Sequence, residues 1–288
     1  MSAQINQQTS VLIQLHIAAL LLGGTAQFSK LIPLPAVDII SYRTLFCGAI
    51  VLAIALALRN QIKPNSLRDG CLILISSVLF AVHWFTYFHA MQVSSVAIGI
   101  VSMFTFPVLT VFIEAAFTKK PISRFDLTMG LLVLMGVVIM TSGLELGSQV
   151  VLGVFFGLIS AFAVSFRNVI VGQYLSGYSP LTLMAYHGFI SFLVTWPFTS
   201  SDITQINPAS WLLILLLASL FTAVPHTQIT HGLQHYSAKK VSMIISLQVV
   251  YAALIAYLLL SETLSWGTVI GGTCILCAAL GESLRKKT

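Results

Sequence analysis

The chain has 288 residues, of which 57% are hydrophobic and only 8% are charged. Soluble domains carry about 25% charged residues, so this chain lacks the polar surface that a globule in water needs. Its mean hydropathy of +0.96 points the same way. The net charge of +6 does not indicate nucleic-acid binding, because the positive residues lie between apolar runs, as in the loops that orient a membrane protein.

Apolar runs with the length of a membrane-spanning helix, about 20 residues, follow one another along the chain. They cover residues 11–32, 36–58, 70–91, 95–117, 126–144, 151–173, 180–199, 209–232, 241–260 and 266–283. The breaks between them are short, and several contain proline or glycine, which punctuate helices. We therefore predict an all-α integral membrane protein with ten transmembrane helices.

The distribution of lysine and arginine predicts the orientation. With a cytoplasmic N-terminus and ten crossings, the inside loops and tail hold Arg59, Lys63, Arg68, Lys119, Lys120, Arg124, Lys239, Lys240, Arg285, Lys286 and Lys287. Only Lys30 falls outside, while Arg43 and Arg167 lie within spans. This bias predicts a multi-pass protein of the inner (plasma) membrane with both termini in the cytoplasm.

The two halves of the chain repeat each other weakly. A shift of 142 residues places His89 on His231 and Gly130 on Gly272. Five helices per half is an odd number, so the second half must be inverted. The basic loop 119–124 accordingly matches a loop at 261–265 that has no lysine or arginine. We predict two inverted five-helix repeats, 11–145 and 150–284, with a substrate site between them near the midplane.

Two stretches carry a resemblance to a known family. Residues 88–95 (FHAMQVSS), followed by Pro107, and residues 259–265 (LLSETLS), followed by Gly271 and Gly272, resemble the EamA-type branch of the drug/metabolite transporter superfamily. The resemblance implies ten helices, a central cavity and the export or uptake of small metabolites. The sequence departs from the family pattern at Val249, where a second proline is common, and at Lys120, where an acidic residue is common.

The third apolar run contains a group of candidate substrate-binding residues, His83, Trp84 and Tyr87. His83 and Tyr87 are four residues apart and therefore share a helix face. Imidazole and aromatic groups together suit an amino acid or another amphipathic metabolite, whereas aromatic packing between helices is the alternative. Because histidine titrates near neutral pH, protons are a candidate coupling ion.

Charged residues inside apolar runs need a reason, since each costs at least about 2.5–3.5 kcal/mol in hydrocarbon. Arg43 lies about 10 Å below the outer surface by helical rise. It is either a contact for an anion or a structural anchor, and Asp38 is near enough in sequence to pair with it. Arg167 and Glu114 lie toward the cytoplasmic ends of their helices. They either snorkel to the interface or pair with each other, or they form a gate or contact substrate. Pro107 is a hinge candidate, with a static bend as the alternative.

Polar residues within other spans are further candidates for the cavity wall. They are Gln27, Ser102, Asn168, His187, Gln228 and Gln248.

These features favour a secondary transporter, with export as the favoured direction, that works by alternating access without catalytic residues or cofactors. Its expected partners are a small-molecule substrate, the lipid bilayer and protons, with no nucleic acid, and it acts as a monomer or a dimer. A membrane-embedded, histidine-dependent metalloenzyme is the alternative, because His231 and His235 form an H-x-x-x-H pair. A structural scaffold is disfavoured by the polar residues within spans. ATP drive is not expected, since no P-loop motif is present.

Overall fold

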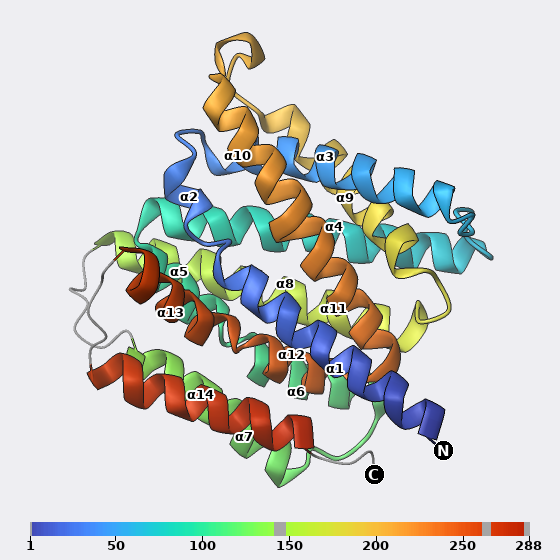
Figure 1. Ribbon diagram of the computed structural model, residues 1–288, viewed down its shortest axis with the longest axis vertical. Coiled ribbons are helices and arrows are strands. Elements are labelled where there is room, and N and C mark those ends of the chain that lie inside the picture. Colours follow the sequence, from blue (N-terminus) through green and yellow to red (C-terminus); the bar gives the residue numbers. More distant parts are fainter. Residues whose placement is uncertain (1, 141–147, 261–265, 285–288) are drawn as a thin grey trace.

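The computed structural model describes residues 2–140, 148–260 and 266–284, and within these ranges the regular structure is helical. Figure 1 shows the helices lying side by side with their axes mostly aligned. The helices are α1 (Ser2–Gly23), α2 (Phe28–Leu31), α3 (Ala36–Ala57), α4 (Leu67–Val93), α5 (Val96–Met103), α6 (Phe106–Thr118), α7 (Arg124–Met140), α8 (Ser148–Tyr174), α9 (Pro180–Thr195), α10 (Pro208–Ala218), α11 (Val224–His235), α12 (Ala238–Ile245), α13 (Gln248–Leu260) and α14 (Trp266–Leu284). A short π-helical segment, Ser219–Ala223, joins α10 to α11.

Each predicted apolar run coincides with one helix or with two consecutive helices. Among the described residues, six helical stretches are long and apolar enough to cross a membrane. They are Thr9–Leu31, Ala36–Ala57, Leu67–Val93, Gln149–Tyr174, Pro180–Phe198 and Pro208–His235. Two shorter apolar helices, Phe106–Thr118 and Val269–Gly281, have a similar composition. The all-helical membrane architecture is therefore confirmed, whereas the count of ten spans and their inversion stay predictions.

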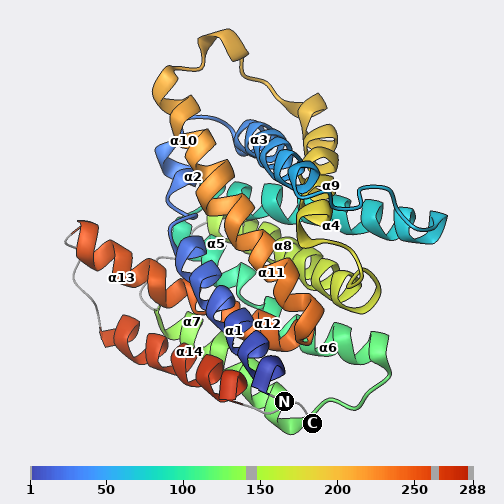
Figure 2. The same ribbon diagram turned by 45° about the vertical axis from the view of Figure 1, so that its right-hand side comes forward.

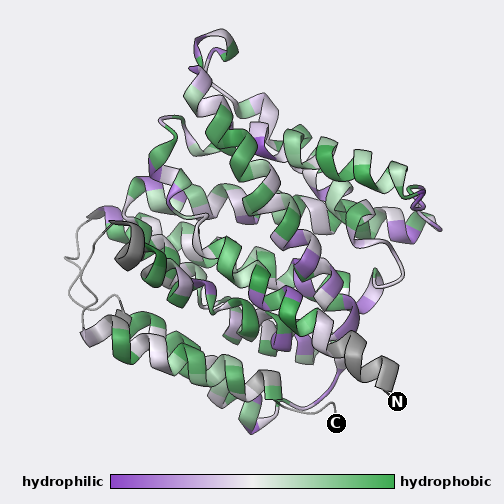
Figure 3. Cartoon of the chain, in the orientation of Figure 1, coloured by the Kyte–Doolittle hydropathy of each residue, from purple (hydrophilic) through white to green (hydrophobic). Residues whose placement is uncertain are grey.

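The outside of the bundle is apolar. Large hydrophobic side chains such as Phe162, Leu193, Leu212 and Ile270 are more than half exposed. Figure 3 shows hydrophobic residues along most helices and hydrophilic ones gathered mainly at helix ends and loops. A protein in water rarely exposes apolar surface on this scale, so this surface fits contact with lipid.

The helices pack in pairs. Helix α4 packs on α8, α11 packs on α1, α3 packs on α9, and α7 packs on α14. The α7–α14 pair forms one edge of the molecule, and α3 with α9 lies on the other side (Figures 1 and 2). The start of α1 and the end of α14 lie at the same end of the bundle (Figure 2).

Two of the spans are broken at matching places. The fourth run is interrupted between Met103 and Phe106, so Pro107 lies in the first turn of α6 and not inside a continuous helix as expected. A missing N–H costs little at that position. The ninth run breaks at the equivalent place without a proline, where the Ser246 hydroxyl donates to the Met243 carbonyl at 2.5 Å. A break in this part of the bundle therefore does not depend on proline.

Helices α3 and α9 cross where two glycines face each other. A Cβ atom on Gly188 would lie 2.6 Å from the Gly48 Cα and 2.9 Å from the Thr44 carbonyl oxygen. Both contacts are with backbone atoms, which cannot move aside as a flexible side chain can. The close approach of these helices therefore requires a small residue at this position.

We predict that Gly188→Val lowers stability by about 1–3 kcal/mol, the usual cost of overpacking a tight interior. The measurement is the melting temperature of the detergent-solubilised protein. Gly177→Ala is the matched control, because a Cβ at Gly177 meets nothing within 4 Å. Equal melting temperatures for the two variants would contradict the proposed role of this crossing.

Candidate functional site

A cavity lies at the centre of the bundle between α1, α3, α4, α5, α6, α8, α11, α12 and the first turn of α13. Its polar lining is formed by Thr25, Arg43, His83, Trp84, Tyr87, Arg167, Asn168, His226, Ser242 and Gln248. Its volume is about 50 Å³. Ligand pockets usually measure roughly 300–1,000 Å³, so the cavity is too small in this conformation to hold a metabolite.

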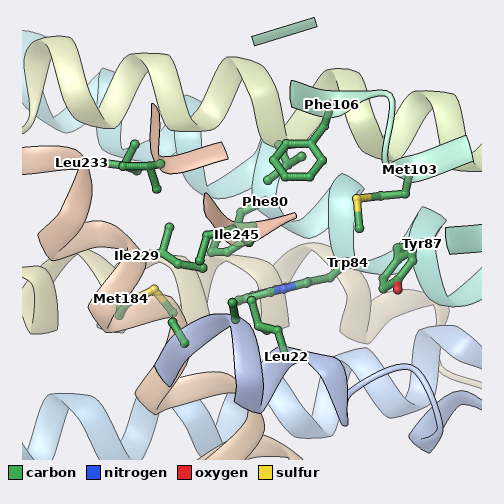
Figure 4. Packing of buried hydrophobic residues seen from close by; sticks show 14 of the residues in the cluster. Leu22, Phe80, Trp84, Tyr87, Met103, Phe106, Met184, Ile229, Leu233 and Ile245 are labelled. Atoms are coloured by element: carbon green, nitrogen blue, oxygen red, sulfur yellow. The ribbon is translucent and has the colours of Figure 1, made fainter. Parts of the chain in front are cut away.

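Aromatic side chains dominate the apolar part of this cavity. Figure 4 shows Phe80, Trp84, Tyr87, Met103 and Phe106 gathered around the space between the helices. The rings of Phe80 and Trp84 stack with centroids 3.9 Å apart. These two residues are four apart on α4 and therefore lie on one helix face.

The same helix places His83 and Tyr87 beside this aromatic pair. Their rings are parallel with centroids 6.1 Å apart, as the spacing of four residues predicts. His83 Nδ1 lies 2.8 Å from the Ser160 hydroxyl oxygen on α8, which fixes the ring against the neighbouring helix. All three aromatic and imidazole residues that the sequence singled out in the third span thus line one cavity.

A hydrogen bond joins the two halves at the centre of the cavity. The Trp84 indole N–H donates to His226 Nε2 at 3.3 Å. The two residues are 142 positions apart, which is the shift of the predicted repeat, so the contact joins equivalent positions of α4 and α11. His226 is not among the candidate wall residues of the sequence analysis, and applying the repeat shift to Trp84 is the signal that would have found it.

Arg43 is buried in the cavity wall with 1% of its surface exposed. Its guanidinium carbon lies 4.9 Å from the centre of the Trp84 ring and 5.1 Å from that of Phe88. Within the described residues, its Nε and Nη1 atoms have no hydrogen-bond partner. The suggested pairing with Asp38 is wrong, because that carboxylate accepts from the backbone N–H groups of Ser200 and Ser201, each at 3.0 Å.

Arg167 enters the cavity from α8 and has only neutral partners in the part of the chain that the structure describes. It donates from Nη1 to the Asn168 side chain at 3.0 Å and from Nη2 to the Thr230 hydroxyl at 2.8 Å. Its Nη2 also lies 3.1 Å from His187 Nδ1. The guanidinium carbon stands 4.3 Å from the centre of the Phe80 ring. His187 therefore contacts the Arg167 guanidinium but does not line the cavity itself.

Glu114 does not pair with Arg167, so that suggestion is also wrong. Its two carboxylate oxygens accept from the backbone N–H groups of Ala238 and Lys239, at 3.0 and 3.1 Å. These N–H groups open α12 and carry the positive end of its dipole. The Lys239 side chain forms an ion pair with Asp126 of α7, so charged contacts join α6, α7 and α12 beyond one end of the cavity.

The other predicted wall residues lie in different places. Gln248 lines the cavity, whereas Gln27, Ser102 and Gln228 are not among its lining residues. Ser102 belongs to a tight packing contact, since a Cβ on Gly157 would lie 2.0 Å from its hydroxyl oxygen. The buried Gln27 and Gln228 side-chain oxygens have no hydrogen-bond partner among the described residues.

The H-x-x-x-H pair lies away from the cavity, at the end of α11. His231 Nδ1 is 2.8 Å from the Gln14 side-chain oxygen, and His235 Nδ1 is 3.0 Å from the His231 carbonyl oxygen. The described residues contain no group of three histidine, cysteine or acidic side chains that could hold a metal ion.

The comparisons with known proteins agree with this architecture. The EamA-like transporter family matches the chain twice, over residues 9–142 and 151–283. The chain belongs to the EamA-like transporter family. It is therefore a multi-pass membrane transporter, as the resemblance in the sequence implied.

Individual relatives of this EamA-like transporter are distant. The pseudopaline exporter CntI of Pseudomonas aeruginosa (strain UCBPP-PA14) is 24% identical over 256 residues, which cover 88% of each chain. Its counterpart in strain PAO1 has the same identity and coverage. A protein of known crystal structure has the same fold, with a TM-score of 0.78 and 16% identity over 94% of this chain and 95% of the other.

We predict that Glu114→Ala destabilises the protein by about 1–3 kcal/mol, because two backbone N–H groups at the start of α12 lose their acceptor. Glu114→Gln keeps one oxygen acceptor in the same place and should lose less. The measurement is thermal unfolding in detergent. Identical unfolding of the alanine variant and the wild type would show that the carboxylate does not hold α12.

Proposed function

We propose that this EamA-like transporter exports a small polar or amphipathic metabolite across the plasma membrane by alternating access through the central cavity. The observation that carries the proposal is the cavity itself, which is lined by two buried arginines, two buried histidines and a half-buried glutamine in the middle of an apolar bundle. Polar groups facing lipid would find no partners, whereas those lining a wet cavity can find them. The relatives named as pseudopaline exporters support the direction of transport.

The alternating-access mechanism is supported by the closed cavity and by the broken spans around it. A space of about 50 Å³ has to open before a metabolite can enter. The breaks after Met103 and Ile245 lie on two spans that flank the cavity and are equivalent under the repeat. Broken helices around a midplane site are typical of transporters built from inverted repeats. We propose the halves 11–145 and 150–284 as the moving units.

The residues proposed as gates occupy the contacts that these motions would change. Pro107 begins α6 directly after one break. Glu114 holds the start of α12, and Arg167 joins α8 to α11 through Thr230. Opening one end of the cavity requires α6 and α12 to separate, which would break the Glu114 contacts. Protons are the proposed coupling ion, since His83 and His226 line the same cavity.

The proposed orientation has both termini in the cytoplasm. The loop that contains Asn60 and the loop that contains Ser179 meet there, with the Asn60 amide donating to the Ser179 hydroxyl at 2.8 Å. A reporter that is active only in the cytoplasm, fused after Thr288, should be active. Activity of a periplasm-specific reporter at the same place would rule out the ten-span topology.

We predict that His83→Ala reduces transport by roughly tenfold or more while the protein still folds, because it removes a polar group that faces the cavity. His89→Ala is the matched control. It lies on the same helix but packs on Phe85 and Phe156, away from the cavity. Export by intact cells and the melting temperature of the purified protein are measured together. Equal transport by the two variants would contradict this site.

A further inference from the structure

The central cavity has an unbalanced positive charge. Two guanidinium groups, those of Arg43 and Arg167, line it, and no carboxylate is found among its lining residues in the described part of the chain. Their exposed fractions are 1% and 0%. Taking an ion out of water costs several kcal/mol, as an order of magnitude, unless an opposite charge or good hydrogen bonds compensate.

Five carboxylates have side chains that the structure describes, and each of the five is engaged elsewhere. Asp38 holds the backbone at Ser200 and Ser201, and Glu114 holds the start of α12. The other three are equally committed: Asp69 accepts from the Tyr178 hydroxyl, Asp126 pairs with Lys239, and Asp202 accepts from Thr204. In this arrangement none of them is placed to neutralise either arginine.

Aromatic rings contact both arginines, and some of the Arg43 N–H groups have no hydrogen-bond partner among the described residues. Arg43 stands over Trp84 and Phe88, with its guanidinium carbon within cation–π distance of both ring centres. Its Nε and Nη1 donors remain without partners among the described residues. A guanidinium presents its donors in a planar fork that matches a carboxylate or phosphate group. Two open donors on a buried, cavity-lining arginine point to an anionic ligand.

The second arginine extends this positive region along the bundle. Arg43 lies in the first third of α3 and Arg167 in the last third of α8, and these helices run in the same direction (Figure 1). The rings beneath them, Trp84 and Phe80, stack on each other. Arg43 stands over Trp84 and Arg167 stands over Phe80, so two positive charges flank this pair of rings. Both charges attract an anion in the cavity. The neutral partners of Arg167 fix its position without cancelling its charge.

We propose that the substrate is an organic anion whose acidic group binds Arg43, with Arg167 as a second cationic contact and the apolar part against Phe80, Trp84 and Tyr87. This inference rests on the proposed transport function and names the chemical class that the cavity accepts. The acidic group supplies the counter-charge that is missing among the described residues lining the cavity. Carboxylate and phosphate share the required chemistry, and the experiment below separates them.

The experiment uses everted membrane vesicles from cells that express the full chain. The vesicles are given the small-molecule extract of the same cells as the probe, and the compounds that accumulate inside are identified by mass spectrometry. We expect the compounds that depend on the chain to carry net negative charge, and their elemental composition shows whether the acid is carboxylic or phosphoric. Arg43→Gln should reduce their uptake at least roughly tenfold, since a buried charge pair is lost. Arg43→Lys should recover only part of it, because it restores the charge but not the planar fork.

Arg68→Gln is the matched control, because Arg68 stacks on Tyr174 outside the cavity and should leave uptake unchanged. Melting temperatures of all variants identify folding defects. Should Arg43→Gln fail to fold, two measurements on the wild type still test the proposal. The first is the net charge of the compounds that it moves. The second is whether uptake is lost when the acidic groups of these compounds are converted to methyl esters or amides. Accumulation of neutral or cationic compounds, or undiminished anion uptake by folded Arg43→Gln, would overturn the anionic substrate and leave the transport function standing. No accumulation of any compound would overturn both.

Discussion

The interior of this bundle is organised around two arginines that are held by aromatic rings in place of acidic side chains. Both side chains are buried, so each guanidinium must be stabilised by what the helices bring to it. Helix α4 provides this support, because Phe80, Trp84 and Phe88 recur every four residues and present their rings along one face. Neutral acceptors on α8 and α11 complete the surroundings of Arg167. The position of α4 at the centre of the molecule follows from this requirement.

Close approach of the helices makes so small a central cavity possible. Gly188 meets Gly48 where α9 crosses α3, and Gly157 receives Ser102 where α8 crosses α5. In lipid, the burial of apolar side chains does not drive helices together. Small residues compensate, because they allow extensive van der Waals contact between helix backbones. The same tight contacts limit how the bundle can open, because packed helices change between discrete arrangements more readily than they deform. The helical backbone is already interrupted between α5 and α6 and between α12 and α13, so these are the places where the bundle can bend.

The sequence predicted the helices well because apolar runs and their breaks are local properties. The described part of every run coincides with helical structure, while residues 141–144 of the fifth run lie outside the described residues. His83, Trp84 and Tyr87 line one cavity because helical spacing brings them close together on α4. Side-chain partners were harder to predict. The residues bonded to Asp38 lie more than 160 positions away in a loop, and Glu114 finds its partners at Ala238 and Lys239, which the sequence assigned to a cytoplasmic loop. Which face of a helix meets its neighbour depends on how the helices cross, so Gln27 and Ser102 could not be excluded from the cavity wall in advance.

The Trp84–His226 hydrogen bond has a consequence for how this architecture can have arisen. In a symmetric pair of identical five-helix chains, a residue close to the two-fold axis meets its own copy, so an indole would face an indole or an imidazole an imidazole. Two identical indoles offer two donors and no strong acceptor. Under the predicted repeat, Trp84 and His226 are equivalent positions, and a donor on one side with an acceptor on the other requires these positions to carry different residues. Two predicted halves joined in one gene can differ at these positions, which gives the cavity a chemical polarity that a homodimer of one half could not have.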